Sequence, residues 1–416
     1  SMYGKVLCGV LCSLLWVMPG WGQAEAEEER ILARFYPYRQ GLPQVAGITP
    51  GMRIDHTNYQ VAAAALPAEI LQYVQAGDFA ITVQETTDMP LREAYIRATL
   101  DHFARVELHD GELRHYVAGL PFPLIDPHDP KAGEKIAWNH RYRDRGETVQ
   151  YWPSNELRNR DGVVERADRF YIAIVFGMHR PAEAHNLPQW AAQGVYSKNY
   201  MRTLAPSDVE GNQVLTCSYD RDTSPDELWV YDVKTRRIRK LVDNPYQAGG
   251  GGELLMEDRS GFSGYIHLYE WRYLGAQVAL VPGPIRTATP SWGGRGNWYP
   301  LDPWELRYVD VVEARPTGSH PVYSRRLLYV DRQTSVTLYA LAYDLAGNHK
   351  RTFLNVYLRP AFGPGRQGEW VPHIAAQASI DYQRERASIF QTHRVVANEP
   401  LNLNRFSIVG LMLYGK

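Results

Sequence analysis

The predicted architecture is based on residues 304–358, WELRYVDVVEARPTGSHPVYSRRLLYVDRQTSVTLYALAYDLAGNHKRTFLNVYL. This stretch contains four runs in which apolar and aromatic residues recur, and these begin at Trp304, Tyr323, Val336 and Phe353. Turn-forming residues separate the runs, as in Arg315–Gly318 and Asp344–Asn348. Such runs are typical of strands, and the connections are too short to hold crossover helices. The stretch therefore predicts an antiparallel meander.

The run from Val336 to Tyr343 differs from an ordinary half-buried strand. Both of its alternating sets of side chains are largely apolar or aromatic, whereas a strand with one solvated face alternates between apolar and polar residues. This run predicts either a sheet covered on both faces or one whose inner face lines an apolar interior.

Composition limits the classes of function. The chain has 416 residues, a net charge of −1 and a sequence pI of about 6.9, so it lacks the basic excess typical of proteins that bind nucleic acid or acidic membranes. Aromatic residues make up 12% of the chain, which favours strands. We expect a mainly β protein of the α+β class with a few helices.

Three helices are predicted before residue 145. The first starts near Pro67, which suits a first turn, and ends at Gly77. Asp88 can cap the second, with Pro90 in its first turn. The third begins at Asp129-Pro130 and carries Trp138.

From Thr148 onward the pattern predicts mostly strands. The expected strands outside the meander are 171–178, 213–219, 228–231, 238–242, a pair at 264–271 and 276–281, and a last strand at 406–414. The pair is expected to turn at Leu274-Gly275, while Gly249–Gly252 and 362–372 are expected to be irregular.

The N-terminus has the pattern of a cleaved signal peptide, residues 1–24. Lys5 precedes an apolar run from Val6 to Met18, which is shorter than the roughly 20 residues that span a bilayer, and small residues precede the expected cleavage after Ala24. We expect residues 25–50 to form a charged lead-in and 51–416 a single domain. The chain is then exported, soluble or peripheral, and located in the periplasm of a Gram-negative bacterium.

Cysteine usage and short motifs do not predict chemistry. Cleavage would remove Cys8 and Cys12, so Cys217 remains and no intramolecular disulfide can form. Two glycine-containing segments, Gly249–Gly252 and Gly261–Gly264, lack the flanks of a phosphate loop or a hydrolase elbow. Three further motifs fit bonded or solvated side chains: His102, His109 and His115; Asp126, Asp129 and Glu134; and the basic run Arg236–Lys240. We expect no catalytic residue, no metal and no cofactor, although the basic run could contact a partner.

Aromatic and large apolar residues are the remaining candidates for a site. Eight of them lie on elements expected to face one another and form the predicted ligand-binding set: Phe122, Trp138, Trp229, Tyr231, Tyr269, Trp271, Leu306 and Tyr308. Core packing explains each residue individually. Together they could line a cleft, because a curved sheet with few covering helices leaves space for an apolar ligand.

Four segments resemble a family of proteobacterial exported proteins of unassigned function (domain of unknown function 1329), often called outer-membrane lipoprotein-sorting proteins. The segments are AGLPFPLIDPHDPKAGEKIAWNHRYR at 118–143, LWVYDVKTRRIRKL at 228–241, EDRSGFSGYIHLYEWRYLG at 257–275, and WELRYVDVVEA with RRLLYVD within 304–331. The resemblance implies a fold similar to the lipoprotein carriers LolA and LolB, a strongly curved antiparallel half-barrel with helices over an apolar cavity. It also implies work beside inner-membrane exporters of the resistance-nodulation-division type, and it supplies no site residues.

Three functions follow as hypotheses. The favoured one is a non-enzymatic periplasmic carrier or chaperone for a lipid, an acyl chain of a lipoprotein or another hydrophobic molecule, handed between an inner-membrane exporter and an outer-membrane partner. The alternatives are a periplasmic hydrolase and an outer-membrane-associated β-barrel or structural protein. The predicted helices do not fit a lipid-exposed barrel.

Overall fold

The computed structural model describes residues 19–182, 186–243, 254–287, 289–319, 321–359 and 370–414. The expectations at Gly249–Gly252 and at most of 362–372 lie outside the described residues. No helix among the described residues is long and apolar enough to cross a membrane.

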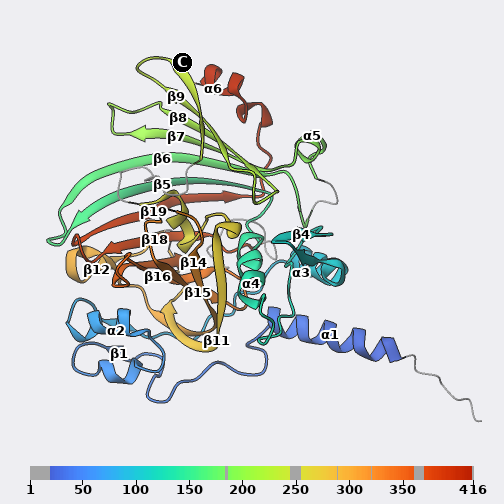
Figure 1. Cartoon of the computed structure of the whole chain (residues 1–416). Helices are drawn as coiled ribbons and strands as arrows, with labels where there is room; N and C mark the ends of the chain where they lie inside the picture. The colour runs from blue at the N-terminus through green and yellow to red at the C-terminus, as the bar shows by residue number, and fades with distance from the viewer. Residues whose placement is uncertain are drawn as a thin grey trace, which may run out of the picture.

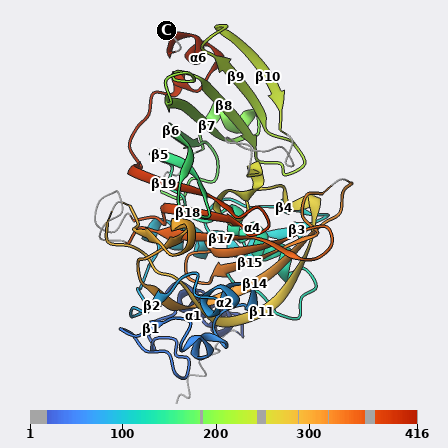
Figure 2. The ribbon, with the colours of Figure 1, turned by 90° about the vertical axis from the view of Figure 1, so that its left-hand side faces the viewer.

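The fold is mainly β and is built on one curved antiparallel sheet of 13 strands, as predicted (Figure 1). The strand order is β10-β9-β8-β7-β6-β5-β19-β18-β17-β16-β15-β14-β11, and the sheet is not closed into a barrel. In Figure 2 it runs from β10 at the top of the molecule to β11 at the bottom. The strands outside the meander are β5 (Thr148–Asn159), β6 (Val164–Phe176), β7 (Val195–Ala205), β8 (Gln213–Tyr219), β9 (Glu227–Asp232), β10 (Arg237–Val242), β11 (Tyr269–Pro282), β18 (Ile374–Asp381) and β19 (Arg386–Ala397).

The predicted meander is confirmed. Its strands pair in chain order and are β14 (Trp304–Pro316), β15 (Arg325–Asp331), β16 (Thr337–Tyr343) and β17 (His349–Tyr357). All seven residues of β16 are buried, so this part of the sheet is covered on both faces.

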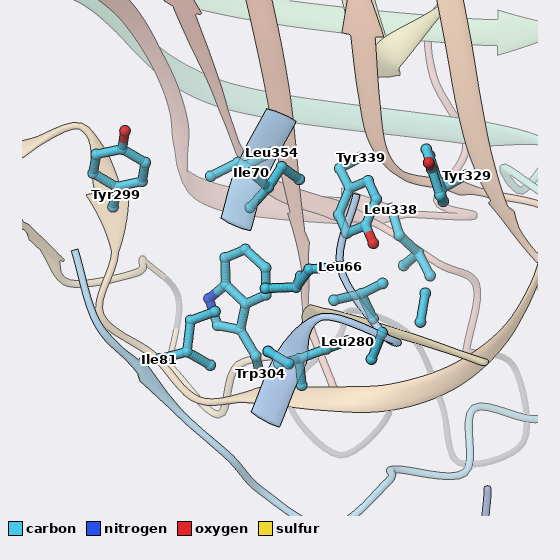
Figure 3. Close-up of a cluster of buried hydrophobic side chains, with 14 of the residues drawn as sticks. Leu66, Ile70, Ile81, Leu280, Tyr299, Trp304, Tyr329, Leu338, Tyr339 and Leu354 are labelled. Atoms are coloured by element: carbon cyan, nitrogen blue, oxygen red, sulfur yellow. The ribbon is translucent and has the colours of Figure 1, made fainter. Parts of the chain in front are cut away.

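One face of the meander packs against α2 (Ala68–Gln75) and its neighbouring loops. Figure 3 shows the Trp304 indole among Leu66, Ile81 and Leu280. Trp304 and Leu280 come from β14 and β11, whereas Leu66 directly precedes α2. Burial of about 200 Å² by one indole contributes several kcal/mol. This cluster ties the N-terminal segment to the sheet.

The other face packs against α4 (Ala132–Arg141) and the 3-10 segment η3 (Met256–Gly261). Ile136 of α4 and Phe262 beyond η3 meet Leu328 and Phe353 of the meander. Gly133 permits the close approach of α4 to β11, because a Cβ there would lie 2.8 Å from the Arg272 backbone. Here too the space above the meander is filled by side chains.

Apart from the 17-residue helix α1, the remaining regular elements are short. The helices are α1 (Pro19–Phe35), α3 (Glu93–His102), α5 (Pro188–Ala192) and α6 (Ile408–Tyr414). The further 3-10 segments are η1 (Tyr59–Ala62), η2 (Phe103–Arg105), η4 (Ile266–Leu268), η5 (Arg295–Asn297) and η7 (Leu403–Arg405). Two-stranded ladders pair β1 (Arg53–Ile54) with β2 (Ile81–Thr82), β3 (Glu107–His109) with β4 (Glu112–Arg114), and β12 (Trp292–Gly293) with β13 (Tyr299–Pro300). The expected lead-in contains part of α1, whose Ile31 and Phe35 are buried beside α3. The helix predicted from Asp88 begins only at Glu93, since the Asp88 carboxylate accepts a bond from the Gln333 side chain instead of capping.

The predicted hairpin at 264–281 is wrong. Residues 269–282 form the single strand β11, which pairs with β14 over its whole length. Gly275 makes a bulge rather than a turn, with a φ of +117° that suits glycine. The long partner strand explains the difference, because β14 offers a ladder on both sides of the bulge.

The predicted last strand at 406–414 is also wrong, since residues 408–414 form α6. The run is apolar without alternation, so its pattern does not distinguish a strand from a helix. In the helix Leu411 is buried against β8 and β9, while Val409, Met412 and Leu413 are more than half exposed. Gly410 permits the close approach of α6 to the preceding segment, because a Cβ there would lie 2.5 Å from the Arg405 carbonyl oxygen.

A buried ion network lies on β14. Arg307 is fully buried and donates to Asp331 at 2.7 Å and to Glu305 at 2.8 Å, and both carboxylates are fully buried too. Burial acts against the Arg307 charge, but Asp331 and the other neighbouring charges leave its pKa raised. The same strand carries an arginine that is itself exposed: Arg315 is 57% exposed and donates to Glu313, a buried carboxylate that also accepts from Arg325.

These two arginines give a matched test of burial. We expect Arg307→Met to lower the free energy of unfolding by about 3–5 kcal/mol, because it leaves two buried carboxylates without their cation. Arg315→Met, the control, should cost less than about 1 kcal/mol, because the Arg315 side chain is exposed to solvent and Glu313 keeps its ion pair with Arg325. Urea unfolding followed by circular dichroism measures both, and equal effects of the two substitutions would contradict this account.

Two histidines are buried in the neutral form. His373 is 1% exposed, and burial, followed by the charge of Arg92, lowers its pKa to about 3. His140 is 2% exposed, and burial lowers its pKa too. In the unfolded chain a histidine has a pKa of about 6.5. Between these two pKa values the unfolded state binds more protons, so stability falls as the pH falls below about 6.5.

We therefore expect His373→Gln to weaken the loss of stability in mild acid. Between pH 6.5 and 5 the wild type should lose about 2 kcal/mol more than the variant, because each pH unit corresponds to about 1.4 kcal/mol per histidine. The exposed His56 supplies the control His56→Gln, which should keep the wild-type slope. Urea unfolding at several pH values measures the slopes, and a variant slope equal to that of the wild type would refute the assignment.

Candidate functional site

The strands β5 to β9 carry a row of half-buried apolar side chains on one face. Cross-strand partners lie on the same face of a sheet. From β5 to β9, each strand contributes one residue that pairs with the next: Tyr151, Ile172, Met201, Val214 and Val230. Each of them is half-buried. We call this row the half-buried apolar row.

The opposite face of the same strands is closed. Ala173, Tyr200 and Leu215 alternate with the half-buried apolar row and are buried in one cluster with Phe406 and Leu411. Phe406 and Leu411 come from the segment that ends in α6, which lies beside the upper strands in Figure 1. Only one face of these strands is therefore left for a ligand.

The pairing pattern also shows on which side the half-buried apolar row lies. Gln377 of β18 bonds to the backbone of η3, so its side chain points to the η3 side of the sheet. Gln377 pairs with Phe390 on β19, Phe390 pairs with Asn155 on β5, and Asn155 pairs with Asp168 on β6. Asp168 and Ile172 are four residues apart on β6, so their side chains lie on the same face. The half-buried apolar row therefore shares the side of the sheet on which α4 and η3 pack.

A polar cleft lies at the end of α4, beside this face. It is lined by residues that include Tyr142, Arg143, Arg145, Phe176 and Tyr196. Ile174, two residues from Ile172 and on the same face of β6, packs with Phe176 and Tyr196. The free space in the cleft is about 20 Å³, roughly the room of one or two water molecules, and thus far less than the roughly 300–1,000 Å³ of a site that encloses a whole ligand.

Three of the eight predicted binding residues meet beside this cleft. Phe122, Trp138 and Trp271 belong to one cluster with Phe176 and Tyr196. Tyr269 contacts this group through Trp271, with ring centroids 5.9 Å apart.

The other four predicted residues lie elsewhere. Trp229 and Tyr231 are on the closed face of the upper strands, packed with the α6 cluster. Leu306 is in the core between the meander and α2, and Tyr308 stacks on Tyr38 with centroids 5.7 Å apart. The structure thus does not bring all eight residues to one cavity.

The half-buried apolar row and the arginines of the cleft were not selected from the sequence. A usable signal exists in β6, where both alternating sets of 171–176 are apolar or aromatic, as they are in β16. For Arg143 and Arg145 no sequence pattern separates them from the other basic residues around 141–145.

The described contacts do not assemble a hydrolase site. Both ring nitrogens of His179 in the cleft are engaged, one with the Val117 carbonyl and the other with Asp220. Ser154 lies 2.9 Å from His393, but no carboxylate among the described residues bonds to His393 to orient it as a base. No group of three His, Cys, Asp or Glu in the described part of the chain is arranged to hold a metal ion.

The fold is similar to several solved structures. The outer-membrane lipoprotein-sorting protein domain from Vibrio parahaemolyticus is 17% identical and has a TM-score of 0.48, and the match covers 68% of this chain and 100% of that chain. A protein of the DUF1329 family from Desulfovibrio piger is 17% identical, with 69% and 99% covered and a TM-score of 0.49. The LolA superfamily protein NE2245 from Nitrosomonas europaea is 12% identical, with 67% and 98% covered and a TM-score of 0.40.

Comparison with curated proteins gave no match. The family model described as a protein of unknown function, DUF1329, matches residues 53–405. This range includes the whole 13-stranded sheet and the cleft. The chain therefore belongs to the DUF1329 family.

Proposed function

We propose that the protein is a carrier that binds the hydrocarbon part of a lipid or of an acylated protein on the half-buried apolar row. The observation that supports this most is the contrast between the two faces of β5–β9. One face is closed by the α6 cluster, whereas the other presents Ile172, Met201, Val214 and Val230 half-buried.

A hydrocarbon chain suits this surface physically. Burial of apolar area contributes about 25 cal/mol per Å², so covering a few hundred Å² supplies several kcal/mol. The meander cannot serve in this way, because its two faces are filled by the clusters around Trp304 and Phe262. The ligand site is thus proposed for the half of the sheet that is not fully packed.

The predicted binding residues fit this proposal in part. Phe122, Trp138, Tyr269 and Trp271 lie around α4 and β11, next to the cleft that adjoins the half-buried apolar row. We propose that they form the aromatic end wall of the site. Trp229 and Tyr231 would support the row from behind, through the strand β9 that also carries Val230.

Val214→Glu and Val163→Glu test the surface. Val214→Glu places a carboxylate in the middle of the row and should weaken binding of a fluorescent fatty acid at least about tenfold, because a charge is costly to bury against hydrocarbon. Val163 is 56% exposed in the turn between β5 and β6, so Val163→Glu should bind like the wild type. Fluorescence titration of delipidated protein measures both variants.

Absence of uptake by the wild type, together with no lipid in native mass spectra of the purified protein, would refute the carrier function. Equal affinities of the two variants would instead place the lipid elsewhere on the molecule.

We further propose that residues 1–24 direct export to the periplasm. The apolar run at 6–18 and the small residues before Glu25 motivate this. Expression in a Gram-negative host should yield a periplasmic protein that begins at Glu25 in N-terminal sequencing, and retention of residues 1–24 would contradict it. The partnership with an inner-membrane exporter rests on the resemblance alone, and crosslinking in whole cells tests it.

A further inference from the structure

The cleft beside α4 contains two arginines without a carboxylate partner among the described residues. Arg143 donates to the His140 carbonyl oxygen at 2.7 Å. The Arg145 guanidinium lies over the Phe176 ring, 4.5 Å from its centroid, and its buried Nε has no hydrogen-bond partner. Neither arginine belongs to any ion pair of the described residues.

The neighbouring carboxylates are already engaged. Asp144, between the two arginines in sequence, accepts from Nε and Nη2 of Arg92 at 2.7 and 2.8 Å. Glu147 accepts from Arg92 and from the Ala182 backbone. Asp220 accepts from His179 at 2.8 Å and from Tyr142 at 2.6 Å. These three acidic groups, the described carboxylates nearest to the cleft, therefore do not pair with Arg143 or Arg145.

This arrangement is electrostatically unfavourable without a ligand. Burial, followed by repulsion from Arg145, lowers the pKa of Arg143 to about 10, so the group is still charged at neutral pH. Two like charges held in a cleft with few acceptors favour an anion between them. Guanidinium groups bind phosphate and carboxylate with two parallel hydrogen bonds, which makes arginine well suited to such a ligand.

We infer that Arg143 and Arg145 bind the anionic headgroup, a phosphate or a carboxylate, of the ligand whose hydrocarbon part lies on the half-buried apolar row. The inference rests on the proposed carrier function for the tail. The cleft adjoins the row through Ile174, Phe176 and Tyr196. Tyr151, the first residue of the row, is within electrostatic range of both arginines, whose charges oppose the burial that raises its pKa to about 12.

Three compounds distinguish the contributions of the headgroup and the tail. Dodecyl phosphate has an anionic headgroup and a hydrocarbon tail, monododecanoylglycerol has a tail with a neutral headgroup, and inorganic phosphate is an anion without a tail. Isothermal titration with delipidated full-length protein should show dodecyl phosphate binding at least about tenfold more tightly than the neutral glyceride. The double variant Arg143→Gln/Arg145→Gln should lose this difference and bind the two lipids alike. Arg143→Lys/Arg145→Lys keeps the charges and should recover part of it.

The control is the double variant Arg53→Gln/Arg97→Gln, which removes two charges whose side chains are 67% and 69% exposed. It should keep the wild-type preference. Thermal unfolding of each variant checks that the fold is intact. If the glutamine variant does not fold, the lysine variant is compared with the wild type instead, and an unchanged preference for dodecyl phosphate would then contradict binding through the guanidinium groups.

The possible results distinguish this inference from the carrier function. If the glutamine variant keeps the preference for dodecyl phosphate while both lipids still bind, the arginine site is refuted and the carrier function stands. If inorganic phosphate binds as tightly as dodecyl phosphate and the glyceride does not bind, the arginines hold a free anion, and both the carrier function and the headgroup assignment are refuted.

Discussion

Burial of both faces of β14–β17 is the constraint on which the rest of the structure depends. A strand such as β16, with all seven residues buried, needs cover from two directions, and the chain supplies it from distant segments. The N-terminal region with α2 covers one face, and α4 with η3 covers the other. Buried arginines complete this packing, since Arg307 and Arg326 each contact two buried carboxylates. Such networks are stable only as complete sets, because removing one partner leaves an uncompensated buried charge.

The same sheet behaves differently at its other end. Beyond β19 the strands β5 to β9 lose cover on one face, while the segment around Phe406 and Leu411 closes the other. A continuous hydrogen-bonded ladder joins the two halves, so the fully packed half holds the open half in shape. A ligand surface on such strands is positioned by a rigid frame, which lowers the ordering cost of binding.

The arginines differ in the same way between neighbouring parts of the structure: some have carboxylate partners, and others have none among the described residues. Arg92, with both Asp144 and Glu147 as partners, is a satisfied cation that links the start of α3 to the start of β5. Arg143 and Arg145 lie only a few residues from these carboxylates in sequence but have no carboxylate partner among the described residues. A partly buried cation without a counter-charge costs stability unless an anion binds to it, and ionisable groups in such unfavourable surroundings are common at functional sites. The headgroup inference connects this local cost to the half-buried apolar row beside it.

The antiparallel meander, the strands near 171–178, 213–219, 228–231 and 238–242, the three early helices and the family could be predicted from the sequence, because alternation, turn residues and cap residues act over a few positions. The strands β7, β18 and β19 were not among the predicted ones. Burial of both faces of β16 was one of the two arrangements predicted from the sequence, since both of its alternating sets of side chains are largely apolar or aromatic. Contacts between distant segments were needed to show that residues 269–282 form one strand, because the ladder of β14 outweighs the local turn signal at Gly275. Such contacts also make 408–414 a helix and determine which of the eight aromatic and apolar candidates meet at α4. Long-range contacts fix these features. They also leave Arg143 and Arg145 without a described carboxylate partner, because the nearby carboxylates are already bonded to Arg92, His179 and Tyr142.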